Sequence, residues 1–226
     1  MRLVHRRPIL SLGLGVLCSV LGVLCIAAFN VSSGAFAQSS GPIVVPPIPD
    51  PVAVTVDHTT TALIVADFNA SDCPDRPPCA VGQPIASLLA KARAAGATVI
   101  FSTYSSSVLP PPSAAPLPGE IVMVRPHSGS PWEGTNEVLQ AANVKTVVFT
   151  GNALDDVIIW GSYALANAYG NTVVVPEDAS YAADAYRTAA TFFKLLDLGN
   201  ASRNLNNTPL QPKAVTLTRS DLVTFQ

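Results

Sequence analysis

From residue 61 onward, short apolar runs alternate with segments of helical periodicity, and this alternation limits the fold more than any other feature. We predict strands over six runs, which are 61–68, 98–102, 120–125, 146–150, 171–176 and 214–217. Helices are predicted over 83–95, 136–142, about 155–169 and 182–198. Helical crossovers join parallel strands, and helices then cover both faces of the sheet. The pattern therefore predicts an α/β three-layer sandwich with a mainly parallel, six-stranded, doubly wound sheet.

The N-terminal segment has the pattern of an export signal. Three arginines precede an uncharged apolar run over 9–29, and residues 35–37 (Ala-Phe-Ala) supply the small-x-small pattern that signal peptidase cuts. Two interpretations stay open: residues 1–37 are a cleaved signal peptide, or the apolar run is retained as a membrane anchor, since about 20 such residues span a bilayer. Both predict an exported protein, periplasmic or secreted, or held at the membrane by 9–29.

The proline-rich linker marks where the domain begins, and the composition limits which classes of partner the protein can bind. Residues 38–51 are rich in proline and predict an extended linker, which leaves 52–226 as a single domain. Charged residues make up 12% of the chain and the formal net charge is −2, so there is no basic surface for nucleic acid. We expect no nucleic-acid partner, no cofactor, and membrane contact only if the N-terminal segment is uncleaved. The three histidines show no metal-ligand spacing, so no metal is expected either.

Cys73 and Cys79 are the only cysteines left once residues 1–37 are removed. They lie six positions apart in a proline-rich stretch, and an exported protein meets oxidising conditions. The favoured interpretation is a local disulfide that closes this loop. A pair of reactive or redox thiols is the alternative.

Several motifs follow one another along the chain: a strand over 62–68 that ends in Asp67, then Arg125-Pro126, Trp132 and Thr135, and then 150–158 and 164–179. Together they resemble the isochorismatase-like cysteine hydrolases, a family that includes nicotinamidases and other amidases. The run 62–68 is similar to the first strand of that family, which ends in an aspartate, here Asp67. The family's Lys-Pro, later aromatic and threonine resemble Arg125-Pro126, Trp132 and Thr135. Its Thr-Gly-Val-x-Thr-x-x-Cys-Val turn resembles 150–158, and its Ala-rich helix and valine strand closing in Asp-Ala resemble 164–179. The resemblance spans nearly all of residues 55–222 and implies the isochorismatase-like fold.

The resemblance also implies a catalytic triad of aspartate, lysine and cysteine, of which only Asp67 is kept. Arg125 stands at the lysine position, where it supplies positive charge but is effectively never deprotonated. Val157 stands at the position of the nucleophile and has no lone pair, so covalent thiol catalysis is closed. We therefore expect a degenerate member of the family that binds a small molecule or partner. The alternative is an amide or ester hydrolase in which Asp67, with Arg125 and His127, activates water.

Asp155 and Asp156 crowd the start of the helix that carries Val157. They suit the positive end of the helix dipole and predict an N-terminal cap. They would also repel a carboxylate or a developing oxyanion, which argues against anionic substrates. A competing interpretation is that these two carboxylates and Asp67 gather Mg²⁺ or Ca²⁺.

Some residues near the predicted site have a structural interpretation beside the functional one. Asp67 and Arg125 could form a purely structural ion pair that neither binds nor converts a ligand. Trp132 is interpreted as a wall of the pocket or a subunit contact, and His127 as a general base near neutral pH. The family often forms dimers or tetramers, so the resemblance also implies a homo-oligomer.

Overall fold

The computed structural model describes residues 47–69, 78–106, 110–125, 134–198 and 214–226. The predicted signal segment, most of the linker and Cys73 lie outside these ranges, as does the side chain of Cys79. Export, signal cleavage and the disulfide therefore stay predictions. Within the described ranges there is no helix with the length and apolar character that crossing a bilayer requires.

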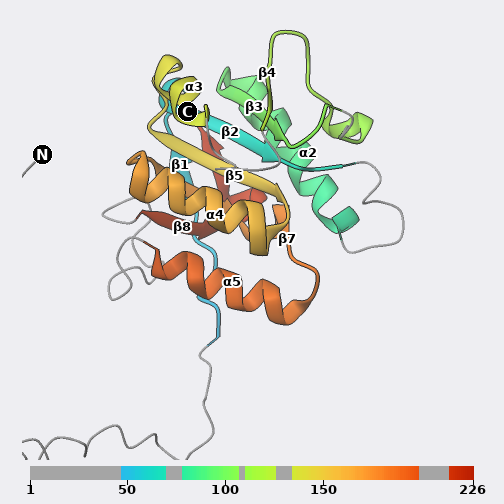
Figure 1. The fold of residues 1–226 in the computed structure, drawn as a ribbon, viewed down its shortest axis with the longest axis vertical. Helices are drawn as coiled ribbons and strands as arrows, with labels where there is room; N and C mark the ends of the chain where they lie inside the picture. The colour runs from blue at the N-terminus through green and yellow to red at the C-terminus, as the bar shows by residue number, and fades with distance from the viewer. Residues whose placement is uncertain (1–46, 70–77, 107–109, 126–133, 199–213) are drawn as a thin grey trace, which may run out of the picture. The chain divides into compact units, whose positions relative to one another are not determined.

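Within the described residues the central sheet has seven parallel strands: six run in the order β4-β3-β2-β5-β6-β8, and the short β7 pairs with β5 off this path (Figure 1). The strands are β2 (Thr61–Ala66), β3 (Thr98–Thr103), β4 (Ile121–Val124), β5 (Thr146–Asn152), β6 (Thr172–Pro176), β7 (Ser180–Tyr181) and β8 (Val215–Thr218). All six predicted strands are present, and the α/β fold class is confirmed. Central strands such as β2 are buried along their whole length, as expected of a sheet covered on both faces.

The four predicted helices are present as α2 (Pro78–Ala95), α3 (Thr135–Ala141), α4 (Ile159–Tyr163) and α5 (Ala185–Asp197). The helix predicted over about 155–169 differs in form, because π-helical turns flank α4 as η4 (Leu154–Ile158) and η5 (Ala164–Ala168). At its start the N–H of Ile158 donates to the carbonyl of Ala153, five residues back, at 3.1 Å. The described residues also include four short 3-10 turns: η1 (His58–Thr60), η3 (Pro112–Ala114), η6 (Glu177–Ala179) and η7 (Ser220–Leu222).

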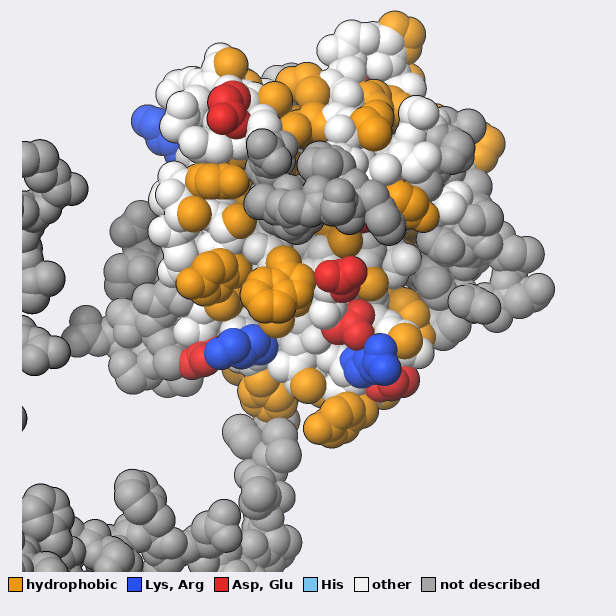
Figure 2. All heavy atoms as spheres, in the orientation of Figure 1, with side chains coloured by type: hydrophobic (Ala, Val, Ile, Leu, Met, Phe, Trp, Pro, Cys, Tyr) orange, Lys and Arg blue, Asp and Glu red, His pale blue; other side chains and the backbone are white. Residues whose placement is uncertain are grey.

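Two hydrophobic cores lie on opposite faces of the sheet. Successive strand residues point to opposite faces, so Ile64 packs in the core beneath α3, α4 and α5, whereas Leu63 packs in the core beneath α2. Figure 1 shows α4 and α5 side by side on one face. The three layers follow from this alternation. On the surface over α4 and α5, Figure 2 shows apolar side chains between charged ones, and Trp160, Tyr163 and Tyr186 are exposed.

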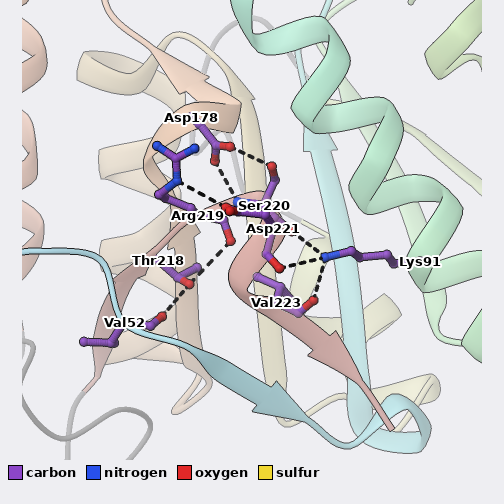
Figure 3. Close-up of polar contacts among 8 residues, drawn as sticks. All are labelled: Val52, Lys91, Asp178, Thr218, Arg219, Ser220, Asp221 and Val223. Carbon is purple, nitrogen blue, oxygen red and sulfur yellow. Dashed lines mark hydrogen bonds and ion pairs between the residues drawn. The ribbon is translucent and has the colours of Figure 1, made fainter.

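A second, two-stranded parallel sheet of β1 (Val54–Val56) and β9 (Val223–Phe225) was not predicted. Each strand has only three residues, too few for a periodic signal, and the two come from opposite ends of the domain. Polar contacts hold this sheet in place (Figure 3). Lys91 of α2 donates to the carbonyls of Ser220, Asp221 and Val223, at 2.8, 3.2 and 3.0 Å. The backbone and hydroxyl of Ser220 donate to Asp178, which follows β6, at 2.8 and 2.6 Å.

Gly151 is the position where the sheet requires glycine. It lies near the end of β5 with φ +124°, and a Cβ there would lie 1.9 Å from the carbonyl oxygen of Ala66 in β2. No real contact is that short, so any side chain would push the carboxyl ends of β2 and β5 apart.

We expect Gly151→Ala to destabilise the fold by more than about 4 kcal/mol, because backbone and not a flexible side chain would have to move. Gly96→Ala is the matched control: Gly96 also has a positive φ, +75°, but nothing lies within 4 Å of its Cβ position. Its cost should be about 1–2 kcal/mol from backbone conformation alone. Denaturant unfolding of both variants measures the difference, and equal costs would contradict the steric account.

Candidate functional site

Asp67 directly follows β2, at the point where the direction of winding reverses between the neighbouring strands β2 and β5. Ligands in open α/β sheets bind at such a switch point, beyond the carboxyl ends of the strands. The residue has φ +44°, in the left-handed region that aspartate tolerates better than most residues. Its N–H donates to the carbonyl of Ser102 in β3 at 2.9 Å. These features turn the carboxylate away from the sheet ladder and toward the neighbouring strand ends.

Arg125, which follows the edge strand β4, forms a buried ion pair with Asp67. Its Nη2 donates to Asp67 Oδ2, and the side chains are 3% and 8% exposed. The N–H of Tyr104 donates to Asp67 Oδ1 at 3.1 Å, and the N–H of Arg125 donates to the carbonyl of Thr103 at 2.6 Å. The ion pair proposed from the sequence is therefore present, and it bridges the ends of β2, β3 and β4.

Burial raises the pKa of Asp67 above its ordinary value. Arg125 acts in the opposite direction, both as a charge and as a hydrogen-bond donor, and so does the N–H of Tyr104. The charge of Asp156 raises the pKa of Asp67 further, which places Asp156 within electrostatic reach of the pair. The site thus combines one compensated carboxylate with a second, exposed one nearby.

The start of η4 contains no thiol or hydroxyl side chain. Val157 is half-buried and packs against the core beneath α4 and α5. The predicted side-chain cap is wrong: the N-cap of η4 is Ala153, which makes no side-chain cap hydrogen bond. Asp155 and Asp156 lie in the first turn instead, and Asp155 pairs with Arg187 of α5 at 3.4 Å. Because η4 begins at Leu154, both aspartates lie inside its first turn and neither occupies the N-cap position.

A serine could replace the missing thiol only if a base reached its hydroxyl. Ser102 lies beside Asp67 in the neighbouring strand, but its hydroxyl is buried and has no hydrogen-bond partner among the described residues. Asp67 therefore does not activate it. His127 and Trp132 fall outside the described residues, so their predicted roles stay predictions. Within the described ranges no cluster of three His, Cys, Asp or Glu side chains could hold a metal ion.

Comparison with known proteins gives no match by sequence: no protein-family model fits the chain, and neither does any protein with a curated description. Solved structures do match. An isochorismatase family protein from Desulfovibrio vulgaris subsp. vulgaris str. Hildenborough aligns with a TM-score of 0.57 and 21% identity, over 72% of this chain and 95% of its own. The fold is that of the isochorismatase-like hydrolases.

Two further structures support the same fold. An isochorismatase from Pseudomonas putida KT2440 aligns with a TM-score of 0.57 and 18% identity, covering 80% of this chain and 94% of its own. N-carbamoylsarcosine amidase from Thermoplasma acidophilum aligns with a TM-score of 0.54 and 19% identity, covering 72% and 97%. At these identities the likeness is one of fold.

Glu177, at the end of β6 in this isochorismatase-like sheet, is a titratable group that nothing in the sequence indicates. Burial raises its pKa from 4.5 to about 7; Arg219 lowers it, while Asp178 and Asp50 raise it. Its Oε1 is buried without a hydrogen-bond partner among the described residues. The adjacent carboxylate of Asp178 differs because Ser220 donates to both of its oxygens.

We expect Glu177 to make stability depend on pH. The folded state keeps its proton up to about pH 7, whereas the unfolded state loses it near its ordinary pKa of 4.5. Stability should therefore fall as pH rises through this window and stay lower above it. Glu177→Gln should raise Tm by a few degrees at about pH 8 and leave it unchanged at about pH 4. Asp178→Asn, the control, should lower Tm at the higher pH.

We expect the effects of substituting Asp67 and Arg125 on the free energy of unfolding to be strongly coupled. Asp67→Asn and Arg125→Gln should each cost about 3–5 kcal/mol, because each leaves a buried group without its charge partner. The double variant should cost much less than the sum, since it buries two neutral amides. Asparagine also tolerates the left-handed backbone of position 67. Denaturant unfolding of the four proteins gives the coupling energy, and additive costs would contradict a direct interaction.

Proposed function

We propose that this protein is an exported, degenerate member of the isochorismatase-like hydrolases that binds a small molecule or partner without thiol catalysis. The observation that carries the proposal is the pairing of Asp67 with Arg125 beside a helix start that presents Val157. The family resemblance implies that aspartate acts as a base toward a cysteine. Here the aspartate is held by an arginine, and the half-buried valine at the cysteine position packs against the core.

The charges of the site favour neutral or cationic ligands. The Asp67–Arg125 pair carries no net charge, and the charge of Asp155 is countered by Arg187. Asp156 is exposed and is close enough to raise the pKa of Asp67. Among the described residues no ion pair compensates Asp156, so a carboxylate ligand would meet its negative charge and anionic substrates are disfavoured.

A second function, hydrolysis by activated water, is favoured by one observation. The raised pKa of Asp67 makes it a stronger base than an ordinary aspartate. Against this, both carboxylate oxygens already accept hydrogen bonds, from Arg125 and from the N–H of Tyr104. A base engaged in this way abstracts a proton from water less readily, so binding without turnover is the better-supported function.

The purified protein should show no turnover above background against a panel of primary amides and esters. Asp67→Asn is the comparison that separates the two functions, because it removes the base and keeps the shape. A measurable rate in the original protein that Asp67→Asn abolishes would overturn the binding-only proposal and establish the hydrolase.

A further inference from the structure

A small pocket opens beside Asp67 on the α2 side of the sheet. Its volume is about 110 Å³, and its walls include Val65, Phe101, Val122 and Val124 from three neighbouring strands. These side chains share one face, because alternate strand residues point to the same side. Asp67 lines the same pocket, so its carboxylate lies at the wall of a mainly apolar cavity.

A set of hydrogen bonds from Arg93 of α2 fixes the segment that contributes Pro116 to the pocket wall. Arg93 donates to both carboxylate oxygens of Glu120, at 2.7 and 2.8 Å, and to the carbonyl of Ala115 at 2.8 Å. Glu120 also accepts the N–H of Leu117 at 2.7 Å, and hydrogen bonding from Arg93 lowers its pKa. Pro116, which lines the pocket, lies between two of these anchored residues. This part of the pocket wall is therefore formed without a ligand, as in most small-molecule sites.

The pocket lies on the opposite side of the sheet from Val157. The side chains of Val65 and Phe101 belong to the core beneath α2, whereas Val157 packs against the core beneath α4 and α5. A group held in the pocket is therefore separated from the place where the family resemblance puts a nucleophile. Asp67 is the residue that both regions share.

The size and chemistry of the pocket define what it can hold. Its 110 Å³ is less than the ~150 Å³ of an apolar cavity that binds benzene and far below the ~300–1,000 Å³ of pockets for larger ligands. Only a compact branched alkyl group or part of a ring fits. Asp67 accepts two hydrogen bonds, whereas a carboxylate has about four acceptor sites. It can therefore accept another from a ligand N–H or O–H.

We propose that this α2-side pocket binds the apolar group of an uncharged molecule whose amide or hydroxyl donor reaches Asp67. This inference rests on the proposed binding function and names the class of ligand. Val122 and Val124 are 54% and 56% exposed at the wall, so a bound alkyl group would cover apolar surface that now faces water. An anion of the same shape would have to lose its hydration against apolar walls beside the Asp67 carboxylate, so we expect it to bind more weakly.

Three probes of one shape test the proposal: isobutyramide, the isobutyrate anion, and 3-methylbutan-2-one, which lacks the N–H donor. We expect isobutyramide at ~10 mM to shift the NMR methyl signals of Val65, Val122 and Val124, binding about tenfold more tightly than isobutyrate. The ketone should bind more weakly than the amide. Val124→Asp should weaken amide binding about tenfold, since it places a charge on the apolar wall.

Tyr186→Asp is the control, because Tyr186 is 83% exposed on α5, over the other face of the sheet, and should leave binding unchanged. No shift of the three valines by isobutyramide, equal binding of the anion, or equal losses in both variants would overturn the pocket assignment. Shifts at Val157 alone would also overturn it while leaving the proposed function intact. Conversely, hydrolysis of isobutyramide would overturn the proposed function but not the location of the pocket.

Discussion

The approach of Gly151 to Ala66 sets the geometry of the carboxyl edge of the sheet. The two backbones pass so closely that no Cβ fits between them, which fixes β5 against β2 at the switch point. Asp67 leaves β2 directly after this contact, and the chain enters η4 shortly after Gly151. Gly151 also pairs with Ser180 of β7. One steric constraint thus places the acidic residue and the start of the helix that carries Val157.

The second constraint is electrostatic and follows from the first. The strands β2, β3 and β4 end side by side, so Asp67 and Arg125 lie next to each other in a buried environment. Either charge without the other would be strongly destabilising there. The pair is neutral as a whole, so the site does not attract ions in the way an unpaired charge would. The Asp67 carboxylate accepts two hydrogen bonds from described residues, and it has further oxygen lone pairs that a ligand donor can use. This makes the site suited to hydrogen bonding with an uncharged ligand.

The sequence predicted those parts of the fold that repeat or that end a strand. Alternation along the chain predicted six of the seven strands of the main sheet, and the places of Asp67 and Arg125 at strand ends agreed with their ion pair. The two-residue β7 was not predicted. It did not predict β1 and β9, since three-residue strands carry no periodic signal. The buried state of Glu177 and the pocket beside Val124 depend on long-range packing, which no local pattern encodes.

Arg125 and Val157 are the two differences from the family motif, and under the proposed function both follow from the loss of thiol catalysis. The resemblance assigns the lysine the task of placing and stabilising charge during attack by a thiolate. Under the proposed function Val157 supplies no thiolate, and the remaining task of the cation is to compensate the buried Asp67. Arginine suits that task better than lysine, because it keeps its charge when buried and presents several donors in a fixed plane. Under the proposed function, arginine is therefore the residue expected at position 125, because a fixed charge is needed there and attack by a thiolate is not.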